Sequence, residues 1–167
     1  MRRMSPLLAL VALAALAGVA SAAPSLQAFG TGGVTIAGDG ATLVNDAGQY
    51  SGVYLKSKSQ SSKALAAVDF SFEYAGATAG GAPRFSIPLN TGPDHYAFID
   101  ALNCGTPGLV STEDTTCKVF LNFSGESFAN WNAFAAAHPT WKVASSGIPF
   151  VIADQPGEYV ISDIVLR

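Results

Sequence analysis

Two stretches near the middle of the chain alternate strictly between apolar and polar residues. They are residues 68–74 (VDFSFEY) and 84–90 (RFSIPLN). A period of two indicates a strand with one face on a core and the other in water. Gly76, Gly80 and Gly81 lie between the two stretches, where they allow the chain to reverse. The pattern predicts a hairpin, or a near-hairpin, at the centre of an all-β domain.

Short apolar segments separated by turn residues run through most of the remaining chain. The Asp39-Gly40 step lies between two of them and is typical of a short hairpin turn. The segment 56–63 (KSKSQSSK) is polar and predicted to be an exposed loop. Further strands are expected at residues 25–29, 34–36, 41–44, 50–56, 96–102, 118–123, 149–152 and 158–166.

One helix is predicted near residues 127–138. Phe128, Trp131 and Phe134 share one face at helical spacing, and the segment is rich in alanine. Ser124 or Ser127 is the expected N-cap. Many short strands with a single helix predict an antiparallel β-sandwich of jelly-roll type. Its expected core comprises Val68, Phe70, Phe72, Phe85, Ile87, Leu89, Phe98, Val119, Leu121, Trp131, Phe134 and Ile161.

The first 22 residues have the pattern of a secretory signal peptide. Arg2 and Arg3 precede an apolar run at residues 7–17, and Ala20-Ser21-Ala22 fits a small-x-small cleavage site. An uncleaved anchor helix is the alternative, although the apolar run is short for a membrane span. Residues 1–22 are therefore predicted to be removed, leaving residues 23–167 as a single secreted domain without a membrane partner.

The net charge limits the classes of binding partner, and the cysteine content bears on the cellular compartment. Removal of the leader leaves seven basic and twelve acidic residues, a net charge of −5 against −3 for the whole chain. A sparsely charged, acidic surface argues against nucleic-acid binding and against attachment to anionic lipid. Cys104 and Cys117 are the only cysteines. In an exported chain such a pair predicts one disulfide, with a redox or metal pair as the alternative.

Arg84 is the most informative polar residue, because basic residues are few and it lies on the polar side of a strand. In a paired hairpin it would meet Glu73 or Asp69 as a surface ion pair. The functional alternative is a planar donor for sugar hydroxyls or for a carboxylate. Tyr54 and Tyr96 would then provide a stacking surface, with Tyr74 as a further candidate.

Sequence signals for catalysis are weak. The histidines are His95 and His138, and no metalloprotease, phosphate-loop or nucleophile-turn motif is present. Asp69 and Glu73 share one strand face, but their α-carbons would be about 13 Å apart. Asp100 on another strand is a nearer potential partner. A carboxylate-dependent glycoside hydrolase is therefore the least favoured function.

Residues 159–166 (YVISDIVL) resemble the closing strand of jelly-roll carbohydrate-binding modules, with an apolar run, an aspartate and a further apolar pair. The resemblance implies a β-sandwich that binds carbohydrate. It also implies Asp163 as a ligand of a structural calcium ion; no other cofactor is expected.

Taken together, these patterns predict a secreted, non-catalytic binding domain for a carbohydrate or cell-wall polymer. The predicted ligand-binding residues are Arg84, Asp69, Glu73, Tyr54 and Tyr96. An extracellular structural or protein-interaction domain without a small ligand is the alternative that the same patterns allow.

Overall fold

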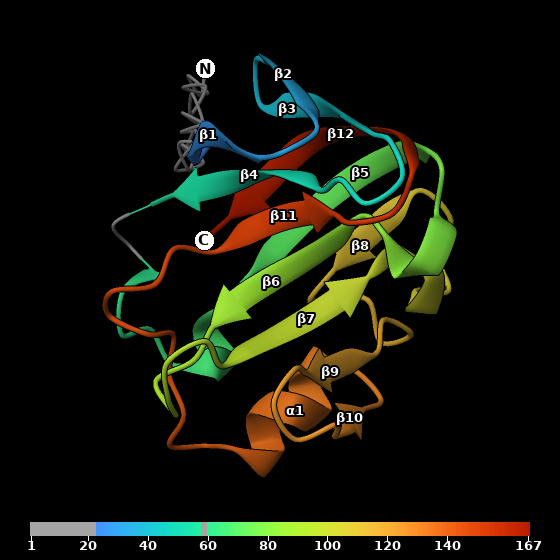
Figure 1. The fold of residues 1–167 in the computed structure, drawn as a ribbon. Helices are drawn as coiled ribbons and strands as arrows, with labels where there is room; N and C mark the ends of the chain where they lie inside the picture. The colour runs from blue at the N-terminus through green and yellow to red at the C-terminus, as the bar shows by residue number, and fades with distance from the viewer. Residues whose placement is uncertain (1–22, 58–59) are drawn as a thin grey trace, which may run out of the picture.

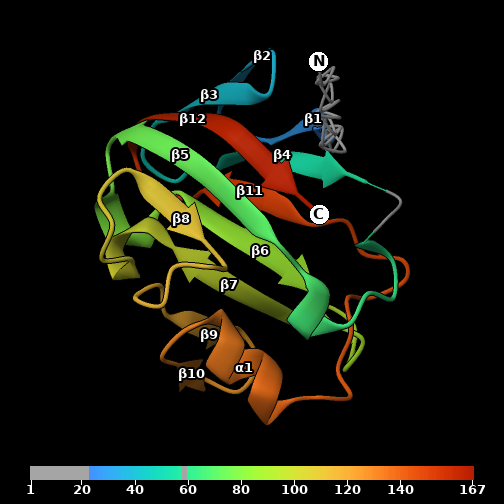
Figure 2. The ribbon, with the colours of Figure 1, turned by 180° about the vertical axis from the view of Figure 1, so that it is seen from behind.

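The computed structural model describes residues 23–57 and 60–167, and the predicted signal peptide lies outside them. In this part of the chain, two antiparallel sheets pack face to face (Figures 1 and 2). The predicted all-β sandwich is thus confirmed. The seven-stranded sheet runs in the order β1 (Ser25–Gly30), β4 (Ser51–Lys56), β11 (Phe150–Ala153), β6 (Arg84–Pro88), β7 (Tyr96–Asp100), β9 (Val119–Leu121) and β10 (Ser127–Phe128). The five-stranded sheet runs β2 (Gly33–Ala37), β3 (Gly40–Asn45), β12 (Gly157–Leu166), β5 (Phe70–Gly76) and β8 (Leu109–Ser111).

The central hairpin prediction is wrong. Strand β5 pairs with β12 and β8, whereas β6 pairs with β11 and β7, so the two strands belong to different sheets. They face each other across the core, where the rings of Phe70 and Phe85 stack with centroids 3.5 Å apart. The connection contains the 3-10 turn Ala79–Gly81 and crosses between the sheets. Alternation cannot separate the two arrangements, because a strand has the same buried face in both.

The shorter hairpin at Asp39-Gly40 is confirmed. Strands β2 and β3 pair antiparallel, and Ala37 lies opposite Gly40 across the turn. Gly38 in this turn has a φ of 60°, a conformation that glycine adopts without steric cost. The turn residues alone were enough to predict this hairpin, because the two strands are adjacent in both sequence and space.

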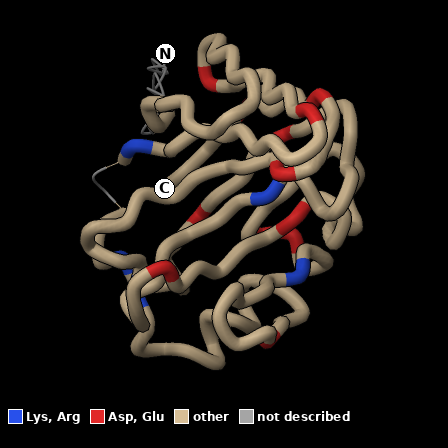
Figure 3. The backbone as a smooth tube through the Cα atoms, in the orientation of Figure 1, with Lys and Arg blue, Asp and Glu red and all other residues tan. Residues whose placement is uncertain are grey.

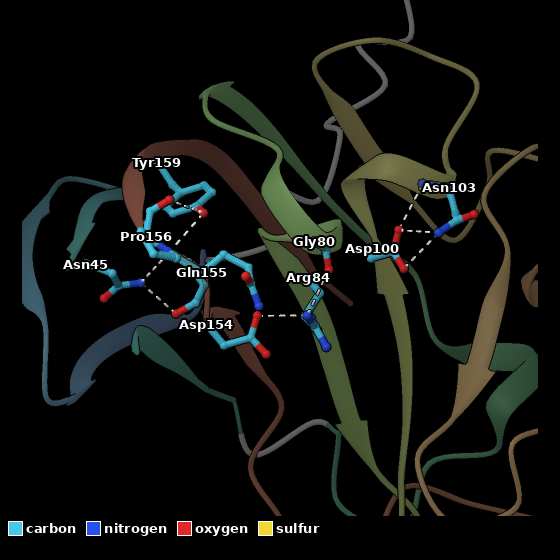
Figure 4. A network of polar contacts seen from close by, with 10 residues as sticks. Asn45, Gly80, Arg84, Asp100, Asn103, Asp154, Gln155, Pro156 and Tyr159 are labelled. Atoms are coloured by element: carbon cyan, nitrogen blue, oxygen red, sulfur yellow. Dashed lines mark hydrogen bonds and ion pairs between the residues drawn. The ribbon is translucent and has the colours of Figure 1, made fainter. Parts of the chain in front are cut away.

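The core lies between the two sheets and contains all but one of the predicted residues. Phe98 is the exception, because it is half-buried on the outer side of β7. Its neighbours Ala97 and Ile99 take the inner positions instead. Tyr159 is fully buried and its hydroxyl donates to the carbonyl oxygens of Gln155 and Pro156 (Figure 4).

The single helix of the described residues, α1 (Trp131–Ala137), begins four residues later than predicted. Ser127 and Phe128 form β10 instead, and the cap is Asn130, whose side chain accepts from the backbone N–H of Ala133 at 2.9 Å. The helix covers one end of the sandwich next to β9 and β10 (Figure 1). Trp131 is buried there, and its Nε1 donates to the Leu65 carbonyl at 2.9 Å.

The predicted disulfide is present. It joins Cys104, at the end of the 3-10 turn Ala101–Asn103, to Cys117, just before β9. The bond ties the loop of twelve intervening residues to the edge of the seven-stranded sheet. Within the described ranges, no helix is long and apolar enough to span a membrane.

Candidate binding site on the outer face of the seven-stranded sheet

A row of aromatic residues crosses the outer face of the seven-stranded sheet. Tyr54 lies opposite Phe150, Phe150 opposite Ser86, Ser86 opposite Phe98, and Phe98 opposite Phe120. The adjacent residues on these strands point into the core, so alternation directs this row outward. Each of the four aromatic side chains is half-buried. The outer face is therefore apolar where a solvated sheet would carry polar residues.

Four rings on this face form a contacting cluster, which we call the aromatic platform: Phe29, Tyr54, Tyr96 and Phe150. The ring centroids of Phe29 and Tyr54 are 4.4 Å apart, and those of Phe29 and Phe150 are 5.6 Å apart. Tyr96 meets the edge of Phe150 with centroids 5.4 Å apart. Tilted and edge-to-face contacts of this kind fix ring orientation. The platform is therefore preorganised rather than assembled from independent side chains.

A glycine makes room for the platform. Gly52 on β4 lies opposite Phe29 on the edge strand β1. A Cβ atom at position 52 would lie 2.5 Å from Cζ of the Phe29 ring and 2.4 Å from the carbonyl oxygen of Val151. Only glycine therefore allows the Phe29 ring to lie flat over β4.

The platform lines one side of a pocket of about 370 Å³. The pocket wall opposite the rings is the segment that precedes β11, with Ser146, Gly147 and Ile148. Gly147 packs closely on Pro88 of β6, because a Cβ there would lie 2.3 Å from Cγ of the proline. The cavity combines an apolar wall with a few polar groups, as ligand pockets generally do.

Arg84 lies on the same outer face, beyond Phe98. Its Nη2 donates to Oδ1 of Asp154 at 2.8 Å and to the carbonyl oxygen of Gly80 at 3.3 Å (Figure 4). The guanidinium carbon lies 5.5 Å from the ring centroid of Phe98, within cation–π distance. The Arg84 Nε is buried and has no hydrogen-bond partner in the described part of the chain.

The structure separates the predicted site residues into two groups. Tyr54, Tyr96 and Arg84 share the outer face of the seven-stranded sheet, while Asp69 and Glu73 belong to the β5 segment of the other sheet. The predicted ion pair of Arg84 with Glu73 or Asp69 is therefore wrong, because it assumed the central hairpin. The partner of Arg84 is Asp154.

Asp69 has a different cationic partner. Its Oδ2 lies 3.6 Å from Nη1 of Arg167, beside a reciprocal pair of backbone hydrogen bonds between the two residues. Asp69 and Glu113 line a common pocket of about 320 Å³ on this side of the molecule. Glu113 was not predicted as a site residue, since nothing in the sequence shows that β5 and β8 are adjacent.

Asp100, the other carboxylate considered for catalysis, is almost fully buried at 7% exposure. Both of its oxygens accept from the side-chain amide of Asn103, and Oδ1 also accepts from the Asn103 backbone N–H (Figure 4). These hydrogen bonds cap the 3-10 turn that leads to the disulfide. Asp100 therefore has a structural role in the turn.

Electrostatics at the platform keep Tyr96 neutral. Burial raises the pKa of its hydroxyl, and the negative charge of Asp94 and the neighbouring Tyr54 raise it further. The backbone N–H of Tyr96 donates to Oδ1 of Asn122 at 2.7 Å, which holds this end of β7 in place. At neutral pH the phenol is therefore available as a hydrogen-bond donor.

The predicted calcium ligand Asp163 lies in the irregular part of β12, where the register shifts between Ser162 and Val165. Asp163 has a φ of 51°. Across residues 23–57 and 60–167, no group of three or more His, Cys, Asp or Glu side chains could hold a metal ion. Calcium binding at Asp163 stays a prediction that the surrounding side chains do not support.

Sequence reasoning missed Phe29, Phe150 and Asp154. A signal for Phe29 was present, because in SLQAFG it has the same parity as Ser25 and Gln27 on an otherwise polar strand face. Phe150 stands in a continuous apolar run, where alternation does not show which face of the strand it lies on.

No protein-family model, curated protein or solved structure matches this chain.

Proposed function

We propose that the protein is a secreted, non-catalytic binding domain whose ligand is a carbohydrate such as a cell-wall polymer. The observation that carries this proposal is the aromatic platform, four contacting rings on the outside of a sheet rather than in the core. Sugar rings present C–H faces that pack on aromatic rings, and their hydroxyls need polar partners at the edge. Pockets with apolar walls and a few polar groups meet both needs.

The pair of Arg84 and Asp154 supports the same ligand class. The guanidinium supplies several donors in a fixed plane and the carboxylate supplies acceptors, so the pair can bind hydroxyls in either role. Both side chains retain solvent exposure, at 21% and 36%. Because each neutralises the other, the pair suits hydroxyl groups better than an isolated charge would.

The charge distribution argues against a nucleic acid as the ligand. Basic residues are few and are spread over the backbone rather than gathered on one face (Figure 3). Nucleic-acid binding depends on neutralising many phosphates at once. The signal-peptide pattern and the disulfide support export to a compartment where cell-wall polymers are encountered.

The test is a binding screen of the mature, oxidised protein against soluble and insoluble polysaccharides. Tyr54→Ala and Tyr96→Ala each remove a stacking ring, and a contact of about 1 kcal/mol predicts a three- to tenfold loss of affinity. Val160→Ala is the matched control, since Val160 is 40% exposed on the five-stranded sheet. The control should bind as the wild type does, and all three variants should keep the wild-type circular dichroism spectrum.

Failure to bind any polysaccharide would refute carbohydrate recognition. Equal losses in the platform variants and in the Val160 control would refute the location of the site. Either result would favour the alternative of a protein-interaction domain. Exposed Val44 and Val160, on the neighbouring strands β3 and β12, would then be the apolar surface to examine.

A further inference from the structure

A second pocket adjoins the platform pocket at the edge of the seven-stranded sheet. Its volume is about 570 Å³, and it shares Ser146, Gly147 and Ile148 with the platform pocket. The two pockets are therefore adjacent at the segment that precedes β11. The remaining lining residues of the second pocket are Ser25, Lys56, Ser57, Ser61, Ser145 and Pro149.

Among the residues that the structure describes, Lys56 is the one charged residue that lines either pocket. It follows Tyr54 by two residues at the end of β4, so both side chains leave the strand on the outer face. Their α-carbons are about 7 Å apart, a distance that one sugar ring and its substituent can cover. Lys56 is exposed and forms no ion pair with any described residue.

An unpaired ammonium beside several hydroxyls attracts a compact anion. The serine-lined end of the two pockets therefore carries the cation, and the other end is lined by aromatic rings. The chain has twelve acidic residues, but among the described residues no aspartate or glutamate lines either pocket.

We propose that the ligand is an acidic polysaccharide, with a uronic acid residue whose ring lies on the platform and whose carboxylate lies in the serine-lined pocket against Lys56. This proposal rests on the function proposed above and adds the charge of the ligand. Ser25 and Ser146 supply hydroxyl donors for the carboxylate and for neighbouring sugar hydroxyls, whereas the Ser61 hydroxyl donates to the Ser145 carbonyl at 3.2 Å. Arg84 contributes little to this charge preference, because Asp154 already neutralises it.

The experiment compares a polyuronate with the same polymer after reduction of its carboxyl groups to hydroxymethyl groups. The wild type should bind the polyuronate about two- to fivefold more tightly, the range of one solvent-exposed charge contact. Lys56→Gln should remove this preference. Lys118→Gln is the matched control, because Lys118 is exposed and lines neither pocket, and it should retain the preference.

The outcomes separate the two proposals. Equal binding of the wild type to both polymers would overturn the uronate proposal and leave carbohydrate binding intact. Binding to neither polymer would also overturn the uronate proposal, and carbohydrate binding itself would be refuted only by failure in the wider polysaccharide screen. A preference that survives Lys56→Gln would also overturn the assignment to this pocket. The preference should shrink as the Debye length falls from about 30 Å at 0.01 M to about 3 Å at 1 M salt.

Discussion

The contact of Phe70 with Phe85 across the core provides the sharpest test of the fold. Both side chains are fully buried, and their rings stack with centroids 3.5 Å apart and planes 11° apart. The two residues come from different sheets, so the contact exists only if β5 and β6 face each other. A double-mutant cycle with Phe70→Leu and Phe85→Leu measures this contact directly.

Each single substitution keeps an apolar side chain of similar volume and should cost about 1–1.5 kcal/mol in the free energy of unfolding. Each single variant also loses the ring–ring contact, which costs about 0.5–1.5 kcal/mol more. The double variant loses the same contact only once. The double variant should therefore be less destabilised than the sum of the single variants by that amount. Leucine is preferred to alanine, because two alanine substitutions at about 3–5 kcal/mol each would approach the total stability of a domain.

The assay is urea unfolding of the oxidised protein, followed by fluorescence and circular dichroism, with an unchanged m-value in all four proteins. Phe85→Leu with Phe134→Leu is the control pair, since Phe134 contacts Phe128, Trp131, His138 and Trp141 at the helix instead. Its effects should add within about 0.5 kcal/mol. Additive effects for Phe70 and Phe85 as well would refute the facing arrangement of the two strands.

Three further results are expected. Reduction of the Cys104–Cys117 disulfide should lower the free energy of unfolding by about 3 kcal/mol, measured by urea unfolding. The reason is that the unfolded chain gains conformational entropy when the cross-link is removed. Asn130→Ala should cost about 1 kcal/mol by the same assay, since it removes the helix cap. Tyr96 should titrate above the usual value of about 10 by phenolate absorbance, and Asp94→Asn should lower its pKa only partly, because burial is the larger cause.

Each of these has a result that would contradict it. Oxidised and reduced proteins of equal stability would show that the loop is restrained without the bond. Asn130→Asp should retain the cap, so an equal loss in both Asn130 variants would point to another contact. The raised pKa of Tyr96 contributes stability that is fully present below pH about 10 and lost as pH rises through the folded-state value. A Tyr96→Phe variant with the same alkaline unfolding profile would argue against that contribution.

The local sequence predicted the helix correctly but placed its first residue too early. Phe128 shares the apolar spacing of Trp131 and Phe134, yet it belongs to β10. Its ring still packs on Phe134, with centroids 5.3 Å apart, so the same apolar residue is buried in either conformation. The start is decided by Asn130, which is extended and caps the helix with its side chain. Spacing alone does not reveal which polar residue takes that role.

The binding surface shows a second limit. Tyr54 and Tyr96 were identified as aromatic residues on strands, but their shared neighbour Phe150 is about a third of the chain away from Tyr96 in sequence. The three meet because β4 pairs with β11, and β11 with β6, which pairs with β7. The same strand order moved Asp69 and Glu73 to the other sheet. The strand order decides which outward-facing side chains become neighbours, and no local sequence pattern contains that order.

Alternation and residues close together in the chain were enough to predict most of the short strands, the turn at Asp39-Gly40, the cysteine pair and most of the core. Strand β8 was not predicted, and the residues of β10 were assigned to the helix. Three features depend on long-range strand order: β5 and β6 face each other, Arg84 pairs with Asp154, and the aromatic platform forms. The physical reason is that alternation specifies which face of a strand is buried, whereas strand pairing depends on long-range packing among many faces of similar hydrophobicity.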